Sequence, residues 1–282
     1  MKKLFILLSL SFGSYTFGQI TTPQASPQAK VEQKVGLADI SISYYRPGKR
    51  GRTVFGDVVP FGELWRTGAN ENAKITTSDA LIFGKDTLKA GTYAIFTNPN
   101  KANWEIYFYT DYSNWGTPEN WDEKKIAFKT TATVSKLTET VENFTIGFDK
   151  MENSSAEICM TWENTKVSIP FSLNTKDKVL ASIKKTMDGP TANDYHRAAS
   201  FYFTEKIDMK KALEWSTKAV ELRGESAYWM TRLLAQLQAE NGDYKKAIET
   251  AKKSMAAAEK DGDMNYVKQN KTSIDEWSTK KN

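Results

Sequence analysis

The sequence predicts a protein with two folded domains: an antiparallel β-sandwich or open barrel, followed by an array of α-helical hairpins. Three observations support this order. Apolar and polar residues alternate with a period of two up to about Leu173, as they do in half-buried strands. Beyond Leu173, apolar residues fall four apart, and a segment around Ala212 recurs 35 positions later around Ala247. Aromatic residues make up 12% of the chain, which is enough to build hydrophobic cores.

Residues 29–173 are expected to form the β-rich domain. The apolar members of four alternating runs are Ile40, Ile42 and Tyr44; Trp104, Ile106 and Phe108; Phe144, Ile146 and Phe148; and Ile158, Met160 and Trp162. Turn signals such as Gly84-Lys85 and Asn98-Pro99-Asn100 separate the runs. Several short strands with this punctuation are typical of antiparallel sandwiches and barrels.

Residues 174–282 are expected to form a helical array. The segment Lys206–Glu214 aligns with Asn241–Glu249, and small residues recur in pairs: Ser200 with Ala235, and Ala219 with Ser254. The pattern resembles the tetratricopeptide repeat, a helix–turn–helix in which small side chains let the paired helices approach closely. Asp208 and Asp243 are predicted to cap the second helix of each repeat. Two repeats are visible, and Met264–Trp277 is predicted to form a capping helix.

The first residues predict export. Met1-Lys2-Lys3 precedes the apolar run Leu4–Leu10, and Thr16 and Gly18 are small enough for the recognition positions of a signal peptidase. We therefore expect residues 1–18 to be a signal peptide cleaved between Gly18 and Gln19, and residues 19–28, rich in Thr, Pro, Gln and Ser, to be a flexible leader. The mature chain is expected to be periplasmic or extracellular and soluble, with no membrane span.

Composition excludes several classes of partner and chemistry. The formal net charge is +5, and Lys and Glu are interspersed. This pattern lacks the concentrated basic surface that is typical of nucleic-acid-binding proteins. Cys159 is the only cysteine, so no intramolecular disulfide can form. The only histidine, His196, lies in the helical region, which removes Ser–His–Asp catalysis and histidine-based zinc sites from the β domain. We expect neither a metal nor a cofactor.

Polar and aromatic residues concentrate between Tyr44 and Glu71, where few regular strands fit. Long irregular segments in compact domains are often functional. The candidate ligand-binding residues are Arg46, Arg52, Trp65, Arg66, Asn70 and Glu71, together with Trp115 further along the chain. They would line a cleft for an anionic or polyhydroxylated ligand, with Trp65 as a stacking surface. Alternatively, the arginines and glutamates pair into a structural network and Trp65 closes one end of the fold.

The same stretch carries a family resemblance. Tyr44-x-Arg46-Pro47 and Gly51-Arg52 are followed by Val59–Glu71, which contains the block Trp-Arg-Thr-Gly-Ala-Asn-Glu, and then by Lys89–Phe96 and Trp115-Gly116. In their order and residue identities, these motifs resemble the domain-of-unknown-function family numbered 2911, over roughly residues 27–173. The resemblance implies a β-rich exported domain and supplies no catalytic residues.

Two function classes remain open. The first is a non-catalytic protein whose β domain binds a small polar or glycan ligand and whose helical repeats dock a protein partner. The second is a hydrolase of glycans or cell-wall material that uses a carboxylate pair, with Glu63 and Glu71 or Asp111 and Asp122 as candidates. A calcium-stabilised module using Asp111 and Asp122 is a third idea, although their spacing matches no regular calcium loop.

Overall fold

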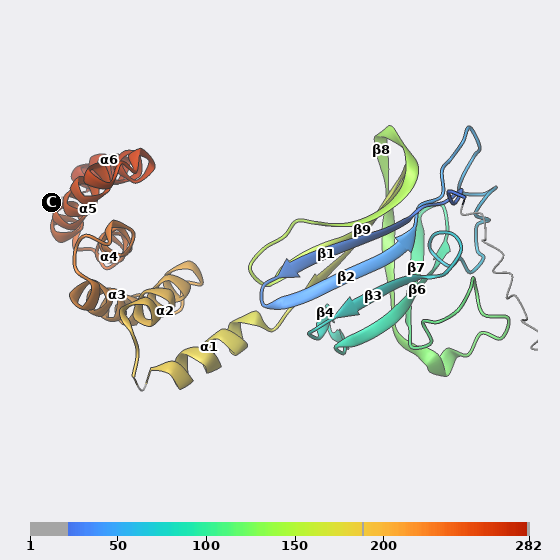
Figure 1. The fold of residues 1–282 in the computed structure, drawn as a ribbon, viewed down its shortest axis with the longest axis horizontal. Helices are drawn as coiled ribbons and strands as arrows, with labels where there is room; N and C mark the ends of the chain where they lie inside the picture. Colours follow the sequence, from blue (N-terminus) through green and yellow to red (C-terminus); the bar gives the residue numbers. More distant parts are fainter. Residues whose placement is uncertain (1–21, 188, 281–282) are drawn as a thin grey trace, which may run out of the picture. The chain divides into compact units, whose positions relative to one another are not determined.

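The computed structural model describes residues 22–187 and 189–280 (Figure 1). The chain divides between Thr175 and Lys176 into two compact units, which we call the β unit and the helical unit. The sequence predicts this boundary between residues 173 and 174. The predicted signal peptide and its cleavage site before Gln19 lie outside the described residues.

The β unit is one antiparallel sheet of nine strands among the described residues, in the order β1-β2-β3-β6-β7-β8-β9-β4-β5. The strands are β1 (Gln28–Val35), β2 (Ala38–Tyr45), β3 (Ala73–Thr77), β4 (Leu81–Phe83), β5 (Asp86–Leu88), β6 (Gly91–Pro99), β7 (Asn103–Tyr109), β8 (Ile126–Asp149) and β9 (Ser155–Ser172). Ile40, Ile42 and Tyr44 are all buried, as their alternation predicted. The predicted β-rich domain is thus confirmed.

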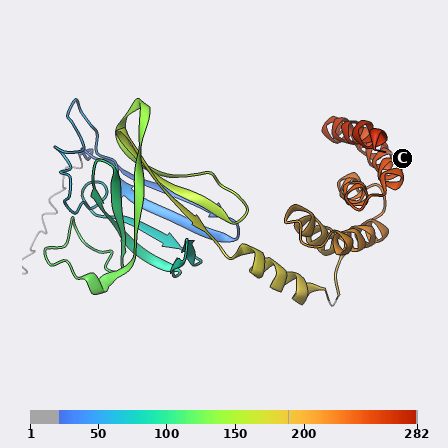
Figure 2. The same cartoon turned by 180° about the vertical axis from the view of Figure 1, so that it is seen from behind.

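Strand β8 belongs to both halves of this sheet. Up to Thr133 it pairs with β7, and from Val134 onward it pairs with β9. The β8–β9 register shifts twice between Lys136 and Thr145, and the two strands bend as a long ribbon (Figures 1 and 2). Irregularities of this kind increase local twist and let a sheet curl around its core.

The segment that follows β2 closes one side of the curled sheet. The amide of Lys49 donates to the carbonyl of Glu142 at 2.8 Å, and the amide of Phe144 donates to the carbonyl of Pro47 at 3.0 Å. Gly48 and Asn143 form the bridge between these two bonds. We call residues 44–50 against 142–146 the seam. The seam joins β2 to β8 across the curled antiparallel sheet, which agrees with the β-rich fold class that the sequence predicted.

Side chains reinforce the seam. The hydroxyl of Tyr44 donates to the carbonyl of Ile146 at 3.0 Å. Arg46 donates through Nε to the carbonyl of Phe144 at 3.1 Å and through Nη2 to Oγ1 of Thr145 at 2.7 Å. Because these acceptors belong to one stretch of β8, a single arginine fixes both its backbone and a side chain.

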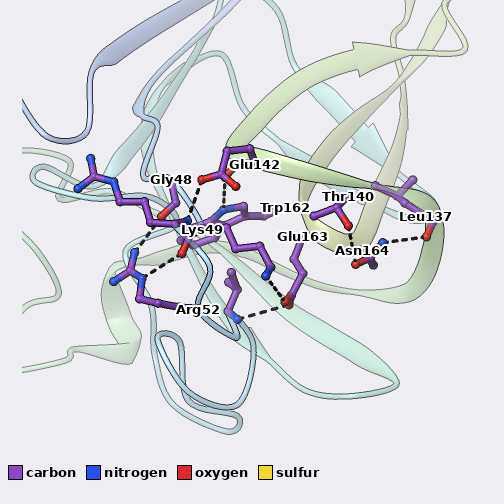
Figure 3. A network of polar contacts seen from close by, with 11 residues as sticks. Gly48, Lys49, Arg52, Leu137, Thr140, Glu142, Trp162, Glu163 and Asn164 are labelled. Atoms are coloured by element: carbon purple, nitrogen blue, oxygen red, sulfur yellow. Dashed lines mark hydrogen bonds and ion pairs between the residues drawn. The ribbon is translucent and has the colours of Figure 1, made fainter.

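Glu142 and Glu163 tie the loop after the seam to the β8–β9 ribbon (Figure 3). The carboxylate of Glu142 accepts from the amide of Arg50 at 2.7 Å, and its carbonyl accepts from Trp162 Nε1 at 3.1 Å. Glu163 pairs with Lys49 at 3.6 Å and accepts from the amide of Val54 at 3.4 Å. These carboxylates therefore hold the loop in place.

The helical unit confirms the predicted helical array. Its helices are α1 (Thr175–Thr186), α2 (Ala192–Thr204), α3 (Met209–Arg223), α4 (Tyr228–Glu240), α5 (Tyr244–Asp261) and α6 (Met264–Thr279). From α2 onward, consecutive helices pack against one another. None of the helices in the described ranges is both long and apolar enough to cross a membrane.

Both predicted caps and three of the four predicted small residues occupy buried or capping positions in this array, whereas Ser200 is only partly buried. Asp208 and Asp243 cap α3 and α5 by accepting from the backbone amides three residues on. Ala219, Ala235 and Ser254 are fully buried. Their small volume allows close approach of the helix backbones, which is the reason that the repeat pattern requires small side chains there.

Replacing Arg46 should loosen the seam. In Arg46→Ala, the carbonyl of Phe144 loses a charged donor, and we expect the free energy of opening of this region to fall by about 2 kcal/mol. Hydrogen exchange of peptides within residues 140–149, measured on the full chain, reports this value. Lys85→Ala, at the exposed turn between β4 and β5, is the control. Equal protection in the two variants would contradict a role for Arg46 in closure.

Candidate functional site

The predicted site residues separate into two groups, and the first belongs to the seam. Arg46 donates to β8 as described above. Arg52 donates through Nε to the carbonyl of Lys49 at 3.0 Å and through Nη2 to the carbonyl of Gly48 at 2.8 Å (Figure 3). The guanidinium groups of both arginines are thus engaged by acceptors of the fold itself.

Trp65 faces the main core. Its backbone exchanges hydrogen bonds with Thr97 at 2.7 and 2.9 Å, which adds the segment around it to the edge of β6. Its indole donates to the carbonyl of Gly68 at 3.0 Å and stacks on Trp162 with ring centroids 5.9 Å apart. Phe55, Trp104 and Phe144 surround it further. The ring that the sequence offered as a stacking surface is therefore engaged by core aromatics.

Arg66 lies on the opposite face of the sheet from Trp65, because side chains alternate along an extended chain. The Trp65–Thr97 bridge places Arg66 beside Phe96. On this face a second hydrophobic cluster forms, separate from the main core: Ala94, Phe96, Tyr107 and Tyr109, with Leu64, Trp121 and Ile126 packed against it. We call this surface the outer face.

Residues 110–122 form a loop that covers part of the outer face, and we call it the covering loop. Trp121 stacks on Tyr109, with centroids 4.5 Å apart and ring planes at 17°, and meets Phe96 edge-on at 5.4 Å. The amide of Asp122 donates to the hydroxyl of Tyr109 at 3.2 Å. These contacts anchor the C-terminal half of the loop through one tryptophan.

The covering loop brings Trp115 next to Arg66. Gly116 is buried with a φ of +92°, and a Cβ at this position would lie 3.0 Å from Nη1 of Arg66. Glycine both tolerates this backbone conformation and leaves space for the guanidinium. The adjacent Trp115 is 71% exposed. The backbone next to Trp115 therefore lies against Arg66 on the outer face, although the two residues are far apart in the sequence.

Unpartnered polar atoms gather at the same place. Within the described part of the β unit, three buried side-chain atoms have no hydrogen-bond partner: Nε of Arg66, Oδ1 of Asn72 and Oδ1 of Asn98. Arg66 lies beside Phe96, Asn98 shares the face of Phe96 two residues on, and Asn72 directly precedes β3. The amide of Asn72 donates to the carbonyl of Asn114 in the covering loop at 3.5 Å. By their strand positions, the three residues belong to the outer face or its margin.

Sequence reasoning missed Asn72 and Asn98. Asn72 directly follows the Trp-Arg-Thr-Gly-Ala-Asn-Glu block, so its position was a usable signal. Asn98 belongs to a turn signature, Asn-Pro-Asn, and nothing local distinguishes it from an ordinary turn residue.

Asn70 and Glu71 lie in the loop that joins Arg66 to β3. Asn70 adopts a φ of +56° and donates to the carbonyl of Ser26 at 3.5 Å. Glu71 pairs with Lys74 at 2.7 Å. Both residues thus lie near Arg66 in the chain, while their polar groups bond elsewhere.

A compact polar cluster borders Asn98. Glu105 pairs with Lys129 at 2.6 Å and accepts from the hydroxyl of Tyr107 at 2.8 Å and from Nδ2 of Asn98 at 3.3 Å. The hydrogen bond from Lys129, with that from Tyr107, lowers the pKa of Glu105. Burial, with the nearby Glu105, raises the pKa of Tyr107. Glu105 is therefore an ionised acceptor that orders its neighbours.

The carboxylates suggested for hydrolysis are not arranged as an acid and base pair. Glu63 is exposed, and Glu71 is bound to Lys74. A hydrogen bond from Lys125 lowers the pKa of Asp111, whereas a general acid needs a raised one. Asp122 accepts from the amide of Lys124 as a helix cap.

The sequence also led to expectations about metal binding and about the single histidine and the single cysteine. Over residues 22–187 and 189–280, no group of three or more His, Cys, Asp or Glu side chains is placed to hold a metal ion. His196 lies in α2, and its burial lowers its pKa. Cys159 is buried and contacts the hydroxyl of Ser168 at 3.3 Å.

Comparison with known proteins identifies a family for the β unit. A family model described as "Protein of unknown function (DUF2911)" matches residues 26–171, which is more than half of the chain. The match includes the seam, the outer face and the covering loop, and it ends before the helical unit. A search of curated proteins found no match.

Acid should weaken the β unit in part through Glu105. Because its pKa in the folded state lies below the ordinary value of 4.5, its contribution is complete above that pH and is lost as the pH falls further. In Glu105→Gln, we expect a lower thermal midpoint at pH 7 and a smaller further fall between pH 5 and pH 3 than in the wild type. Thermal unfolding across this range measures both effects. An unchanged slope would contradict the assignment, and Glu63→Gln serves as the matched control.

Proposed function

The chain belongs to the DUF2911 family of proteins of unknown function, and from this premise we propose that it is an exported, non-catalytic binding protein. Its β unit would bind a polar ligand on the outer face, between Arg66 and Trp115. Its helical unit would dock a protein partner. The predicted signal peptide supports the exported location.

The observation that carries the proposal is the gathering of unpartnered polar atoms beside an exposed tryptophan. A buried donor or acceptor without a partner costs about 1–3 kcal/mol, and Arg66, Asn72 and Asn98 each leave one atom in this state. Folded proteins satisfy nearly all such atoms, so three of them on one face support the proposal that this face binds a molecule. A ligand with acceptors for Arg66, donors for the asparagine oxygens and a face for Trp115 would complete the surface.

The covering loop determines how a ligand reaches these atoms. Gly116 contacts the guanidinium, and the carbonyl of Asn114 accepts from Asn72. Trp121 anchors the C-terminal half of the loop, and Asp111 holds its start through Lys125, so the proposal requires the segment around Asn114 to Gly116 to move between these two anchors. A ligand would then replace loop contacts with its own hydrogen bonds.

The rival hydrolase rests on carboxylates that lysines or a helix cap already engage, except for the exposed Glu63. A lowered pKa at Asp111 suits a structural ion pair rather than proton donation. This arrangement supports binding over glycan hydrolysis.

The helical unit supports the docking role through its surface. Leu222, Trp229 and Met264 are large apolar side chains exposed by 54%, 38% and 62%. Exposed apolar residues on helical arrays are typical of surfaces that bind peptides or partner helices. The spacing of 35 and the buried small residues favour a tetratricopeptide-like array.

Removing Trp115 should weaken ligand binding. In Trp115→Ala, we expect the affinity for a neutral envelope oligosaccharide to fall by about 1.5 kcal/mol, roughly tenfold, because stacking on the indole is lost. Calorimetric titration of the full chain with a panel of neutral cell-wall oligosaccharides measures this change. Trp229→Ala removes an exposed tryptophan of the helical unit and should bind as the wild type does. Equal losses in both variants, or no binding by the wild type, would refute the proposal.

One experiment tests both the export of the chain and the docking of a protein partner by the helical unit. A C-terminally tagged chain expressed in its native host should be recovered from the envelope fraction with Gln19 as its first residue, as shown by mass spectrometry. Cross-linked partners are then compared with those of a chain that ends at Thr175. Identical partner sets would refute the docking role, and an intact N-terminus in the cytoplasm would refute export.

A further inference from the structure

Binding of a neutral ligand to the outer face would leave the positive charge of Arg66 without a partner. Among the described residues, no hydrogen bond or ion pair joins its side chain to another group, and its Nε is buried without a partner. The side chain is only partly exposed to water. A partly desolvated guanidinium normally has a carboxylate or carbonyl partner, because removing it from water is costly.

The other arginines of the motif show how a structural guanidinium is held in this fold. Arg46 and Arg52 each make two hydrogen bonds to acceptors between 2.7 and 3.1 Å away. Arg66 lies in the same family motif, yet it has no such acceptor. Its environment therefore differs in kind from that of the two arginines at the seam.

The neighbouring carboxylates do not compensate this charge. Glu71, in the loop after Arg66, pairs with Lys74 at 2.7 Å. Asp111, at the start of the covering loop, pairs with Lys125 at 3.1 Å. Glu105, a third carboxylate of the outer face, is bound by Lys129 at 2.6 Å. Each of these three carboxylates has a lysine of its own, and none of them forms an ion pair with Arg66.

Building on the proposed binding function, we propose that the ligand is an acidic sugar whose carboxylate binds the guanidinium of Arg66. Arginine matches a carboxylate with two parallel hydrogen bonds. The C–H face of the sugar ring would lie on Trp115, which is 71% exposed next to the glycine that contacts Arg66. Ring hydroxyls would donate to the free oxygens of Asn72 and Asn98 when the covering loop is displaced.

A sugar fits this surface better than an acidic peptide does. The unsatisfied atoms of Asn72 and Asn98 are acceptors, so the ligand needs donors close to its anionic group. A uronic acid carries several hydroxyl donors on the same ring as its carboxylate and presents an apolar ring face to the indole. An acidic side chain offers a carboxylate without a ring of this kind.

The test compares two oligosaccharides that differ only in charge. The full chain is titrated with tri-galacturonate and with its carboxyl-reduced counterpart, a neutral galactose trimer. We expect the wild type to bind the acidic trimer at least tenfold more tightly, with an affinity that falls as salt is raised. Arg66→Gln should bind the two trimers equally, whereas Lys85→Gln, which removes an exposed charge elsewhere, should keep the preference.

Arg66→Lys separates charge from geometry. It retains a positive charge but not the two parallel donors, so we expect an intermediate preference for the acidic trimer. Thermal midpoints of all variants, measured alongside, show whether each one is folded.

The outcomes distinguish this inference from the proposed function. Equal wild-type affinity for both trimers would overturn the acidic ligand and leave neutral glycan binding, with its dependence on Trp115, intact. No affinity for the acidic trimer at millimolar concentration would also overturn it. Binding of tri-glutamate as tightly as the acidic trimer, with the same dependence on Arg66, would overturn the sugar assignment in favour of an acidic peptide.

Discussion

The need to pair the backbone of β8 between residues 142 and 146 is the constraint on which the β unit depends. At this point β8 has left β7, and its register with β9 is irregular, so part of its backbone lacks a regular strand neighbour. Unpaired amides and carbonyls are costly unless another segment bonds to them. The segment after β2 does so through Pro47 and Lys49, and Arg46 adds a charged donor. Closure of the sheet follows from meeting this requirement.

Closure also determines what the outer face contains. The chain that leaves the seam returns to the sheet at Trp65, whose ring fills the core beside Trp162. Because extended residues alternate, placing Trp65 inward obliges Arg66 to point outward, next to Phe96. The outward position of this cation is thus a direct consequence of how the core is filled. The packing of Trp65 on one side of the sheet therefore places a charged side chain on the other side.

The sequence predicted those features that depend on neighbours along the chain. Strand alternation at Ile40 and Ile42 and the caps at Asp208 and Asp243 are local, and the structure has them. The site was predictable only in part, because Arg46, Arg52 and Arg66 look alike in one motif.

Their different environments come from pairings between distant segments, such as residue 65 with 97 and residue 48 with 143. No period or spacing in the sequence reveals those pairings, and the same limit hid Asn98. Gly116 shows what such a pairing means for evolution. Its φ is +92°, and a Cβ at this position would lie 3.0 Å from Arg66, so the residue type allowed at 116 depends in part on a residue fifty positions away. A larger residue at 116 would be strained by the positive φ and would also crowd the guanidinium, so related sequences with arginine at 66 should keep glycine at 116.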